Sequence, residues 1–452
     1  MTALQRLVAG VMVIATLGAC THAPSLATTL DAARTALWRG DLIQAQALAD
    51  KAVALTKTVP GSVDGWTAVL LRTEVQLARL DLASAEPVLA AAVPAGASFD
   101  GIRSRQLYLV ARALVTRGRL AEALEKLEAA APLAPASDPL QMDIGVLTGQ
   151  VRLRLGRWDE AEAGLRESLA RAEGAGDRYR QALVLNNLGL ARRIRNRWDE
   201  ALPFFEGVLA LDDLERFTVY GAALTNAGMC YSRLGQFDRA IPMQQRSVAK
   251  YAKSAVRGDY ERALGELGNT YVLQGDQENG RRFLQQALDV ATDAKIPADA
   301  ALWAGNLASE YLEIGDWDRA DALNARALEI RSAGHAGSVV HNTLNAARIA
   351  EGRSRSEQAD QLYRAALAHG GQESDVLWEA HAGLASVAAA SGKSEEANAE
   401  YKAALDVIDR TRSELVKTDY KLSFLTQLIH FYESYVDLLV QTGQADRALE
   451  VA

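Results

Sequence analysis

Residues Gly156–Ala161 read GRWDEA, and the same motif returns as NRWDEA at Asn196–Ala201. Each copy lies between two stretches whose apolar residues recur with the spacing of a helix. The leading Gly or Asn suits the left-handed residue that ends a helix. An Asp or Ser after it can cap the next helix, and Glu suits that helix's first turn. The motif therefore predicts two helices joined by a tight turn. Other copies begin at Gly40, Leu80, Gly118, Gly235, Gly275, Gly315, Ser354 and Gly392.

The copies recur with a period of about 40 residues, from 156 to 196, 235, 275 and 315. A fixed period of this length is typical of helical-repeat proteins, in which each unit buries its apolar face against the next. The composition agrees, because only 10 prolines occur among 452 residues and aromatic residues make up 6%. We therefore predict an all-α solenoid of helix pairs rather than one compact core.

Small residues recur in the first helix of each pair, seven positions before the turn. Glycine inside a helix costs about 1 kcal/mol relative to alanine, so its repeated use indicates close contact between helices. The Ala at the end of the motif likewise indicates that two helices approach closely. Aromatic residues share one position after the turn, and we expect Trp158, Trp198, Phe237 and Trp317 to be wedges in the core. The small residues are Gly149, Gly189, Gly228, Gly268, Ala308, Ala347 and Ala385.

These motifs resemble the tetratricopeptide repeat. NNLGLA at Asn186, ELGNTY at Glu266 and NLASEY at Asn306 match the first helix of that family, and Tyr231 lies in its tyrosine position. The resemblance extends over residues 31–410 and is strongest over 141–330. It implies a right-handed α-solenoid whose concave face is formed by the first helices. The observed period of about 40 exceeds the family's usual repeat of about 34 residues, which implies longer helices or loops.

The first 20 residues have the layout of an export signal. Arg6 precedes an apolar run, Leu7–Leu17, that is too short to span a bilayer. Leu17-Gly18-Ala19-Cys20 resembles the lipobox of bacterial lipoproteins, which implies that Cys20 becomes the lipidated first residue. An ordinary signal with an incidental cysteine is the alternative. Residues 21–30 are expected to be a flexible tether, and Thr21 in place of Asp implies the periplasmic side of the outer membrane.

The period breaks after Ala404, since the next turn glycine, Gly443, follows Gly392 by about 51 residues. Residues 411–452 are expected to be further helices, with the last one cut short. This segment resembles the part of bacterial tetratricopeptide proteins that leads into a caspase-like CHAT domain. The matching residues are Arg412–Leu415, Phe424-Leu425, Tyr432, Tyr435–Leu439 and Ala448–Ala452. The alternative is an ordinary capping helix; neither reading supplies a catalytic residue.

We find no catalytic, cofactor or metal-binding motif, and we therefore predict a protein that is not an enzyme within these residues. Cys230 lies in a helical pattern and is expected to be a small buried residue. Basic and acidic residues are interspersed and the net charge is −8, so nucleic acid is not an expected partner. The histidines at 22, 335, 341, 369, 381 and 430 lack ligand spacing.

Asparagine supplies the strongest functional indication. It recurs two positions before the small residue of the first helix, although it is a mediocre helix former. In tetratricopeptide proteins this position can face the groove, where the amide binds a peptide backbone or carboxylate. Alternatively, these amides bond neighbouring helices. Arg193 and Arg233 could add a preference for anions, with solvated surface as the alternative. The predicted peptide-binding residues are Asn186, Asn187, Asn226, Asn269, Asn306, Asn345, Arg193 and Arg233.

Together these features predict an exported, lipid-anchored tetratricopeptide protein. It would bind a protein or peptide on its concave face, as an adaptor or sensing module at the bacterial envelope. The alternative function is the N-terminal regulatory part of a CHAT-type cysteine peptidase.

Overall fold

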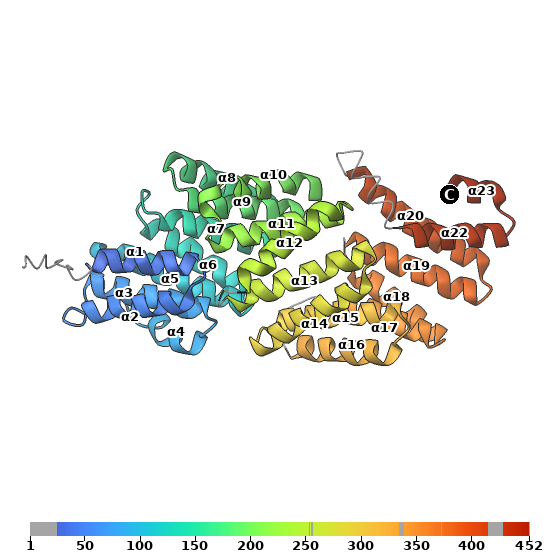
Figure 1. Cartoon of the computed structure of the whole chain (residues 1–452), viewed down its shortest axis with the longest axis horizontal. Helices are drawn as coiled ribbons and strands as arrows, with labels where there is room; N and C mark the ends of the chain where they lie inside the picture. The colour runs from blue at the N-terminus through green and yellow to red at the C-terminus, as the bar shows by residue number, and fades with distance from the viewer. Residues whose placement is uncertain are drawn as a thin grey trace, which may run out of the picture.

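The computed structural model describes residues 25–252, 254, 256–333, 339–371, 373–414 and 428–451. Over these ranges the chain forms 22 α-helices, three short 3-10 helices and no strand. The α-helices follow one another as antiparallel pairs (Figure 1). The first helices are α1 (Leu26–Trp38), α3 (Val63–Ala78), α5 (Asp100–Thr116), α7 (Leu140–Arg154), α9 (Arg178–Arg193), α11 (Thr218–Arg233), α13 (Arg257–Gln274), α15 (Pro297–Glu313), α17 (Val340–Gly352), α19 (Ser374–Ala390) and α22 (Ile429–Gln441).

Each first helix packs against the second helix of its own pair and against the second helix that precedes it. Most first helices also touch the first helix of the next pair, so they line one face of the solenoid. The second helices are α2 (Leu42–Leu55), α4 (Leu82–Leu89), α6 (Leu120–Ala130), α8 (Trp158–Gly174), α10 (Trp198–Leu209), α12 (Phe237–Tyr251), α14 (Gln277–Asp293), α16 (Trp317–Ser332), α18 (Ser356–His369), α20 (Ser394–Glu414) and α23 (Ala445–Val451). The 3-10 helices are Ala97–Phe99, Ala131–Leu133 and Asp212–Leu214. The predicted all-α, right-handed solenoid is confirmed.

The turn between the helices of a pair contains a left-handed residue at each predicted position. The backbone φ is 61° at Leu80, 56° at Asn196 and 58° at Ser354, and the glycines at the other positions are also left-handed. The motif therefore encodes the turn even where glycine is replaced. The glycines are Gly40, Gly118, Gly156, Gly235, Gly275, Gly315, Gly392 and Gly443.

Capping of the second helix follows the prediction only where Asp comes directly after the left-handed residue. Asp41 accepts a hydrogen bond from the backbone N–H of Gln44, and Asp81, Asp276 and Asp316 do the same in their turns. Copies with Arg at this position have no side-chain cap. There the arginine pairs with a first-turn glutamate, as Arg157 does with Glu160.

The small residues of the first helices permit the predicted close approach. A Cβ atom on Gly189 would lie 2.5 Å from Cε1 of Phe205 on α10, and one on Gly149 would lie 2.7 Å from Leu165 on α8. Both Phe205 and Leu165 are fully buried. The Ala that ends the motif is also buried in every copy that has it. Pairs of helices thus meet over small residues on one side and large residues on the other.

The aromatic position after the turn is only partly in the core, so the expectation of buried wedges is wrong for Trp158. Its side chain is 39% exposed, and the guanidinium of Arg195 lies 5.6 Å from the ring centroid. Arg233 lies over Trp198 in the same way, at 5.7 Å. An indole at the rim can thus be covered by an arginine at the end of the next first helix or in the turn that follows it. Trp317, in contrast, fills the space above Gly352.

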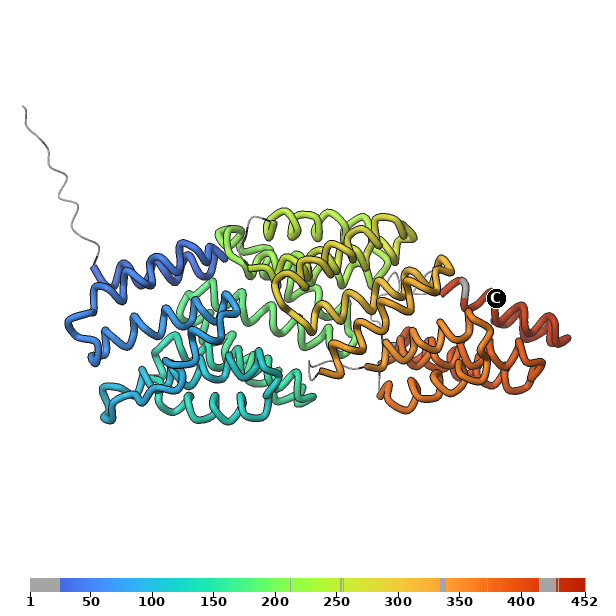
Figure 2. The backbone as a smooth tube through the Cα atoms, turned by 90° about the horizontal axis from the view of Figure 1, so that it is seen from below, coloured from blue at the N-terminus to red at the C-terminus, as the bar shows by residue number. Residues whose placement is uncertain are grey.

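The turn between α1 and α2 touches helices four and five pairs further along the chain. The ring of Trp38 stacks on Tyr179 at the start of α9, with centroids 4.3 Å apart. Thr218 donates a hydrogen bond to the carbonyl of Trp38 at 3.1 Å, and Ser254 donates one to the carbonyl of Gly40 at 3.3 Å. Figure 2 shows the blue N-terminal helices reaching the green ones. The N-terminal turn of the superhelix is therefore closed on itself.

The structure changes two predicted boundaries. The tether was expected to continue to residue 30, but α1 begins at Leu26, because the Ser25 side chain accepts the N–H of Thr28 and Leu30 is buried. The C-terminal segment forms an eleventh pair, α22 and α23, which packs on α20 through the stacked rings of Tyr401 and Tyr435. The predicted signal and Cys20 lie outside the described residues. No described helix has the length and hydrophobicity that crossing a bilayer requires.

We predict that Gly189→Ala lowers the free energy of unfolding by about 1–3 kcal/mol, because the new methyl group overlaps the buried ring of Phe205. The measurement is chemical denaturation followed by circular dichroism. Gly207→Ala in the facing helix α10 is the matched control. Its Cβ would lie 3.5 Å from Leu185, an ordinary contact, so stability should rise by up to about 1 kcal/mol. Equal effects of the two substitutions would contradict the packing argument.

Candidate functional site

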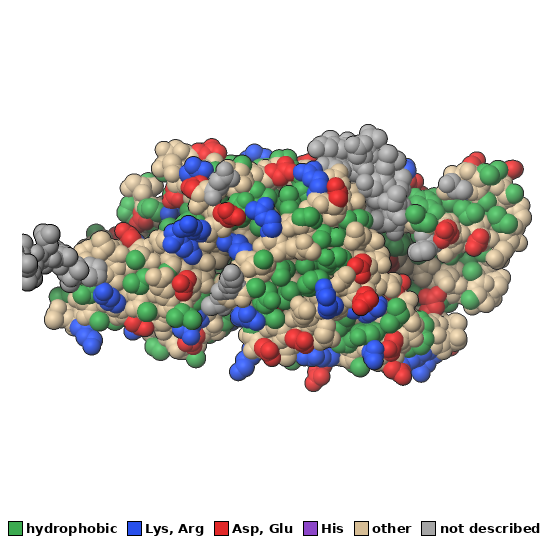
Figure 3. Space-filling model, in the orientation of Figure 1, with side chains coloured by type: hydrophobic (Ala, Val, Ile, Leu, Met, Phe, Trp, Pro, Cys, Tyr) green, Lys and Arg blue, Asp and Glu red, His purple; other side chains and the backbone are tan. Residues whose placement is uncertain are grey.

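The candidate site is the inner face of α9, α11, α13, α15, α17 and α19, where the first helices lie side by side. We define the inner face by a set of polar residues on these six helices. Figure 3 shows basic and acidic side chains interspersed on one side of the molecule rather than gathered in one patch. The inner-face residues are Asn186, Arg193, Asn226, Arg233, Glu266, Asn269, Asn306, Asn345, Arg348 and Glu379.

Asparagine amides link successive first helices. Asn226 on α11 donates from Nδ2 to Oδ1 of Asn186 on α9 at 3.1 Å. Asn306 on α15 donates to Oδ1 of Asn269 on α13, also at 3.1 Å. Each bond uses only part of an amide, which has two donors and an acceptor with two lone pairs. The predicted bonding between helices is therefore present, and unused capacity is left on the same side chains.

The other two predicted asparagines behave differently. Asn345 on α17 donates to the backbone carbonyl of Gly305 on α15 at 2.9 Å, which again joins neighbouring first helices. Asn187 is only 1% exposed and donates to the carbonyl of Leu183 in its own helix at 2.7 Å. A side chain this buried cannot reach a ligand on the inner face. Asn187 is thus excluded from the site.

Arg193 and Arg233 carry the positive charge of the inner face. Arg193 is half-buried and donates a hydrogen bond to Sδ of Met229 at 3.1 Å. Burial lowers the pKa of its guanidinium. Within the described ranges neither arginine has a carboxylate oxygen within 4.0 Å. The expectation of solvated surface is therefore wrong for Arg193 but fits the exposed Arg233.

Glu266 on α13 is the acidic group close to these arginines. Burial raises the pKa of its carboxyl group, and the nearby charges of Arg193 and Arg233 only partly oppose this. Asn269 donates a long hydrogen bond of 3.4 Å to it. One carboxylate thus faces two arginines, and the N-terminal end of the inner face has an excess of positive charge.

Toward the C-terminal end of the inner face, negative charge is in excess instead. Arg348 on α17 pairs with Glu313 and donates to Oγ of Ser309 at 3.1 Å. Glu379 on α19 is half-buried, and its pKa is raised by burial more than Arg348 lowers it. None of the described cationic side chains has a nitrogen within 4.0 Å of its carboxylate. Two carboxylates therefore accompany one arginine here.

The N-terminal first helices carry an ion-pair ladder that was not anticipated from the sequence. Arg105 on α5 binds Glu74 on α3 at 2.7 Å and Asp143 on α7 at 3.3 Å, and Arg180 on α9 binds Asp143 at 2.8 Å. Arg112 adds a second cation to Glu74 at 3.0 Å. Burial alone would raise the pKa of Glu74, but Arg105 and Arg112 outweigh it and lower the pKa. Because the charges of the ladder pair with one another, fewer of them are available to a ligand than on the inner face.

A spacing signal for this ladder exists in the sequence. Arg105, Asp143 and Arg180 are separated by 38 and 37 residues, close to the repeat period. Residues one period apart occupy equivalent positions on neighbouring helices. Alternating charge at such a spacing therefore predicts ion pairs between repeats.

Comparison with known proteins agrees with the geometry. The family model described as "Tetratricopeptide repeat" matches residues 147–213 and 219–293. The chain is a tetratricopeptide repeat protein. A search of curated proteins finds no match.

Solved structures of low sequence identity are similar to this tetratricopeptide repeat protein. One is the complex of NprR with its cognate peptide NprX, at 15% identity and a TM-score of 0.53, covering 76% of this chain and 99% of that one. Others are the apo quorum sensor NprR from B. thuringiensis (14% identity, TM-score 0.49, 84% and 97% covered) and a tetratricopeptide repeat protein from Parabacteroides merdae (17%, 0.40, 61% and 96%).

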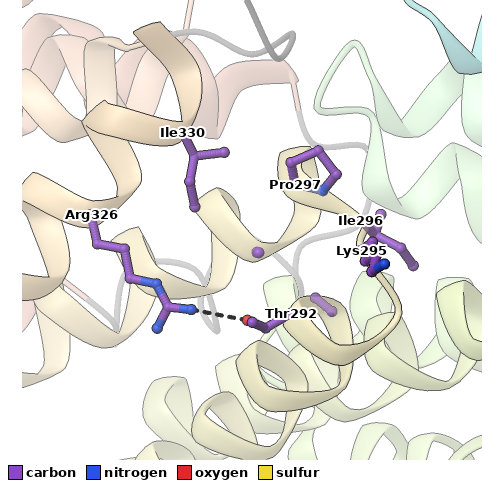
Figure 4. Close-up of a pocket in the computed structure, with 8 residues that line it drawn as sticks. Thr292, Lys295, Ile296, Pro297, Arg326 and Ile330 are labelled. Atoms are coloured by element: carbon purple, nitrogen blue, oxygen red, sulfur yellow. Dashed lines mark hydrogen bonds between the residues drawn. The ribbon is translucent and has the colours of Figure 1, made fainter. Parts of the chain in front are cut away.

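The remaining candidates for chemistry are accounted for by structure. A cavity of about 290 Å³ lies between the α14–α15 turn and α16, but its Arg326 already donates to Thr292 at 3.1 Å (Figure 4). Cys230 is buried as predicted, and burial raises the pKa of its thiol to about 12. His341 and His381 pair with Glu373 and Glu400. The described residues contain no cluster suited to a metal ion. His22 and His335, and the side chain of His430, lie outside the described part of the chain.

A buried carboxyl group lies at the contact between α13 and α15. Glu261 on α13 is fully buried and accepts a hydrogen bond from the indole N–H of Trp303 on α15. Burial, with Asp299 close by, raises the pKa of Glu261 to about 9. The group is therefore protonated in the folded protein at neutral pH, whereas it is ionised in the unfolded chain.

We predict that Glu261→Gln stabilises the tetratricopeptide solenoid above pH 7. Because the folded pKa is raised, the wild type has its full stability below the unfolded pKa of about 4.5 and loses stability as pH rises toward 9. The slope is at most about 1.4 kcal/mol per pH unit within this window. Gln cannot ionise, so urea denaturation from pH 5 to 9 should show a flatter profile. The exposed Glu329→Gln on α16 is the control, and parallel profiles for wild type and Glu261→Gln would refute the assignment.

Proposed function

We propose that this tetratricopeptide repeat protein binds an extended peptide, or an extended segment of a protein, on the inner face between α9 and α19. The observation that carries the proposal is the pair Arg193 and Arg233, two arginines without a carboxylate partner among the described residues. Beside them lie asparagine amides with unused hydrogen-bonding capacity. Backbone groups and carboxylates of a peptide match these donors and acceptors.

Two considerations support a peptide rather than a small molecule. The polar groups are distributed along several first helices instead of converging on one enclosed cavity. In addition, a protein with the same fold, NprR, has been solved in complex with a cognate peptide. A row of amides on neighbouring helices suits a ligand that is itself a row of amides.

We predict that Arg233→Ala reduces peptide retention about tenfold, because a charge-assisted hydrogen bond contributes about 1.5–3 kcal/mol. The probe is a pool of ten-residue peptides with random sequence and free carboxyl ends. Peptides retained by the immobilised protein are quantified by mass spectrometry. Arg246→Ala is the matched control, since Arg246 is an exposed arginine on the second helix α12. If both variants retain as much peptide as the wild type, the inner face is not the binding site.

The proposed setting is the bacterial envelope, with the chain attached to a membrane through Cys20 and acting as an adaptor or sensing module. Its support is the lipobox-like sequence Leu17–Cys20. A diacylglyceryl group together with an amide-linked chain gives stable attachment, whereas one acyl chain is marginal.

We expect radiolabelled palmitate to be incorporated into the wild-type protein expressed in bacteria and not into Cys20→Ala. The Cys230→Ala variant serves as the control because it removes the other cysteine and leaves Cys20 in place. Equal labelling of wild type and Cys20→Ala would refute the lipid anchor without affecting the peptide-binding proposal.

A second candidate function rests on the resemblance of residues 412–452 to the segment that precedes CHAT domains. In that case the peptide-binding solenoid would be the regulatory part of a cysteine peptidase. The coding sequence beyond the codon for Ala452 distinguishes the two functions.

A further inference from the structure

The inner face carries half-buried charges of opposite sign at its two ends. Arg193 on α9 and Glu379 on α19 are both half-buried, and neither has an oppositely charged group within 4.0 Å among the described residues. Removing a charge from water without a partner is unfavourable, so such groups favour a ligand that supplies the missing charge. The end with Arg193 therefore favours a negative group on the ligand, and the end with Glu379 favours a positive group.

The basic end attracts a negative group. Arg193 and Arg233 come from neighbouring helices, and the opposing Glu266 has its own pKa raised by burial. The third arginine in the vicinity, Arg262, already pairs with Asp299 at 3.4 Å. An acidic side chain or terminal carboxylate of a ligand could therefore bind Arg193 and Arg233 without displacing an existing ion pair.

The acidic end attracts a positive group. The charged groups that act on Glu379 are those of Arg348, Asp375, His341 and Glu313. Arg348 is committed to Glu313 and Ser309, and His341 to Glu373 at 3.1 Å. A lysine, an arginine or an amino terminus of the ligand would meet a carboxylate that lacks a close cation.

The distance between the two ends sets the length of such a ligand. Four steps between neighbouring first helices separate α11 from α19. Packed helices lie about 8–10 Å apart, so the path is at most about 40 Å. An extended chain advances about 3.3 Å per residue, and a peptide of up to about twelve residues therefore reaches both ends.

We infer that the ligand is a dipolar peptide of up to about twelve residues, bound with its acidic end on Arg193 and Arg233 and its basic end on Glu379. This inference rests on the proposed peptide-binding function and adds the charge pattern and placement of the ligand. The linked asparagines Asn269 and Asn306, on α13 and α15, lie between the two charged ends and bind the peptide backbone.

The test compares four pools of ten-residue peptides with blocked ends and six random central positions. One pool has two lysines at one end and two glutamates at the other, one has glutamates at both ends, one has lysines at both ends, and one has neutral ends. Retention by the full chain is measured by mass spectrometry. We expect the dipolar pool to be retained at least tenfold more than the three others.

Charge reversal then tests the placement. Glu379→Lys should reduce retention of the dipolar pool about tenfold and increase that of the glutamate-ended pool, whereas Arg233→Glu should increase retention of the lysine-ended pool. Glu329→Lys on α16 makes the same change of net charge away from the inner face and should leave all preferences as they are.

The outcomes separate the two proposals. Equal retention of all four pools, or preferences that Glu379→Lys and Arg233→Glu do not change, would overturn the dipolar ligand and leave the peptide-binding function intact. Retention of no pool would overturn both.

Discussion

The contact between a small residue of the first helix and a large residue of the second holds this molecule together. Gly189 against Phe205 and Gly149 against Leu165 let the backbones approach until an added methyl group would overlap its neighbour. Repeated along the chain, the contact sets the spacing of the first helices. That spacing in turn brings asparagine side chains of neighbouring helices within hydrogen-bond distance.

The charged side chains of the first helices are paired in the N-terminal part of the row and less completely paired in the rest. In the N-terminal part, Glu74, Arg105, Asp143 and Arg180 pair with one another, which offsets the cost of removing them from water. On the inner face from α9 onward, Arg193, Arg233 and Glu379 are without such partners in the described residues, whereas Arg348 is paired with Glu313. A self-paired ladder favours one fixed arrangement of helices, whereas unpaired charges favour association with something else. The chain thus joins a part whose inner charges are paired to a part in which Arg193, Arg233 and Glu379 have no such partner among the described residues.

The closure of the N-terminal turn links these parts physically. Tyr179 and Thr218, which contact Trp38 or its carbonyl, lie at the starts of α9 and α11. The same two helices carry Arg193 and Arg233 at their other ends. The helices that present the basic end of the inner face are therefore held at their starts by the first pair, which restricts how far they can move when a ligand binds.

The sequence by itself determined the repeat. A left-handed residue, a first-turn carboxylate and a small residue act locally or between adjacent helices, so they can be read at a fixed period even where Leu80, Asn196 or Ser354 replaces glycine. It also placed Asn226, Asn306 and Arg193 on the first helices. The same local signals predicted the start of α1 poorly, because a short polar segment before a helix can equally belong to its cap.

Only the tertiary structure decided how those side chains are used. Asn187 and Asn226 occupy equivalent positions in the sequence, yet one is buried against its own helix and the other bonds Asn186 across the helix boundary. The stacking of Trp38 on Tyr179 joins residues four pairs apart, and its geometry follows from the accumulated rotation of every pair between them. Rotation per repeat is a sum of small packing angles. It arises only when all the pairs are stacked, and it has no counterpart in any single motif.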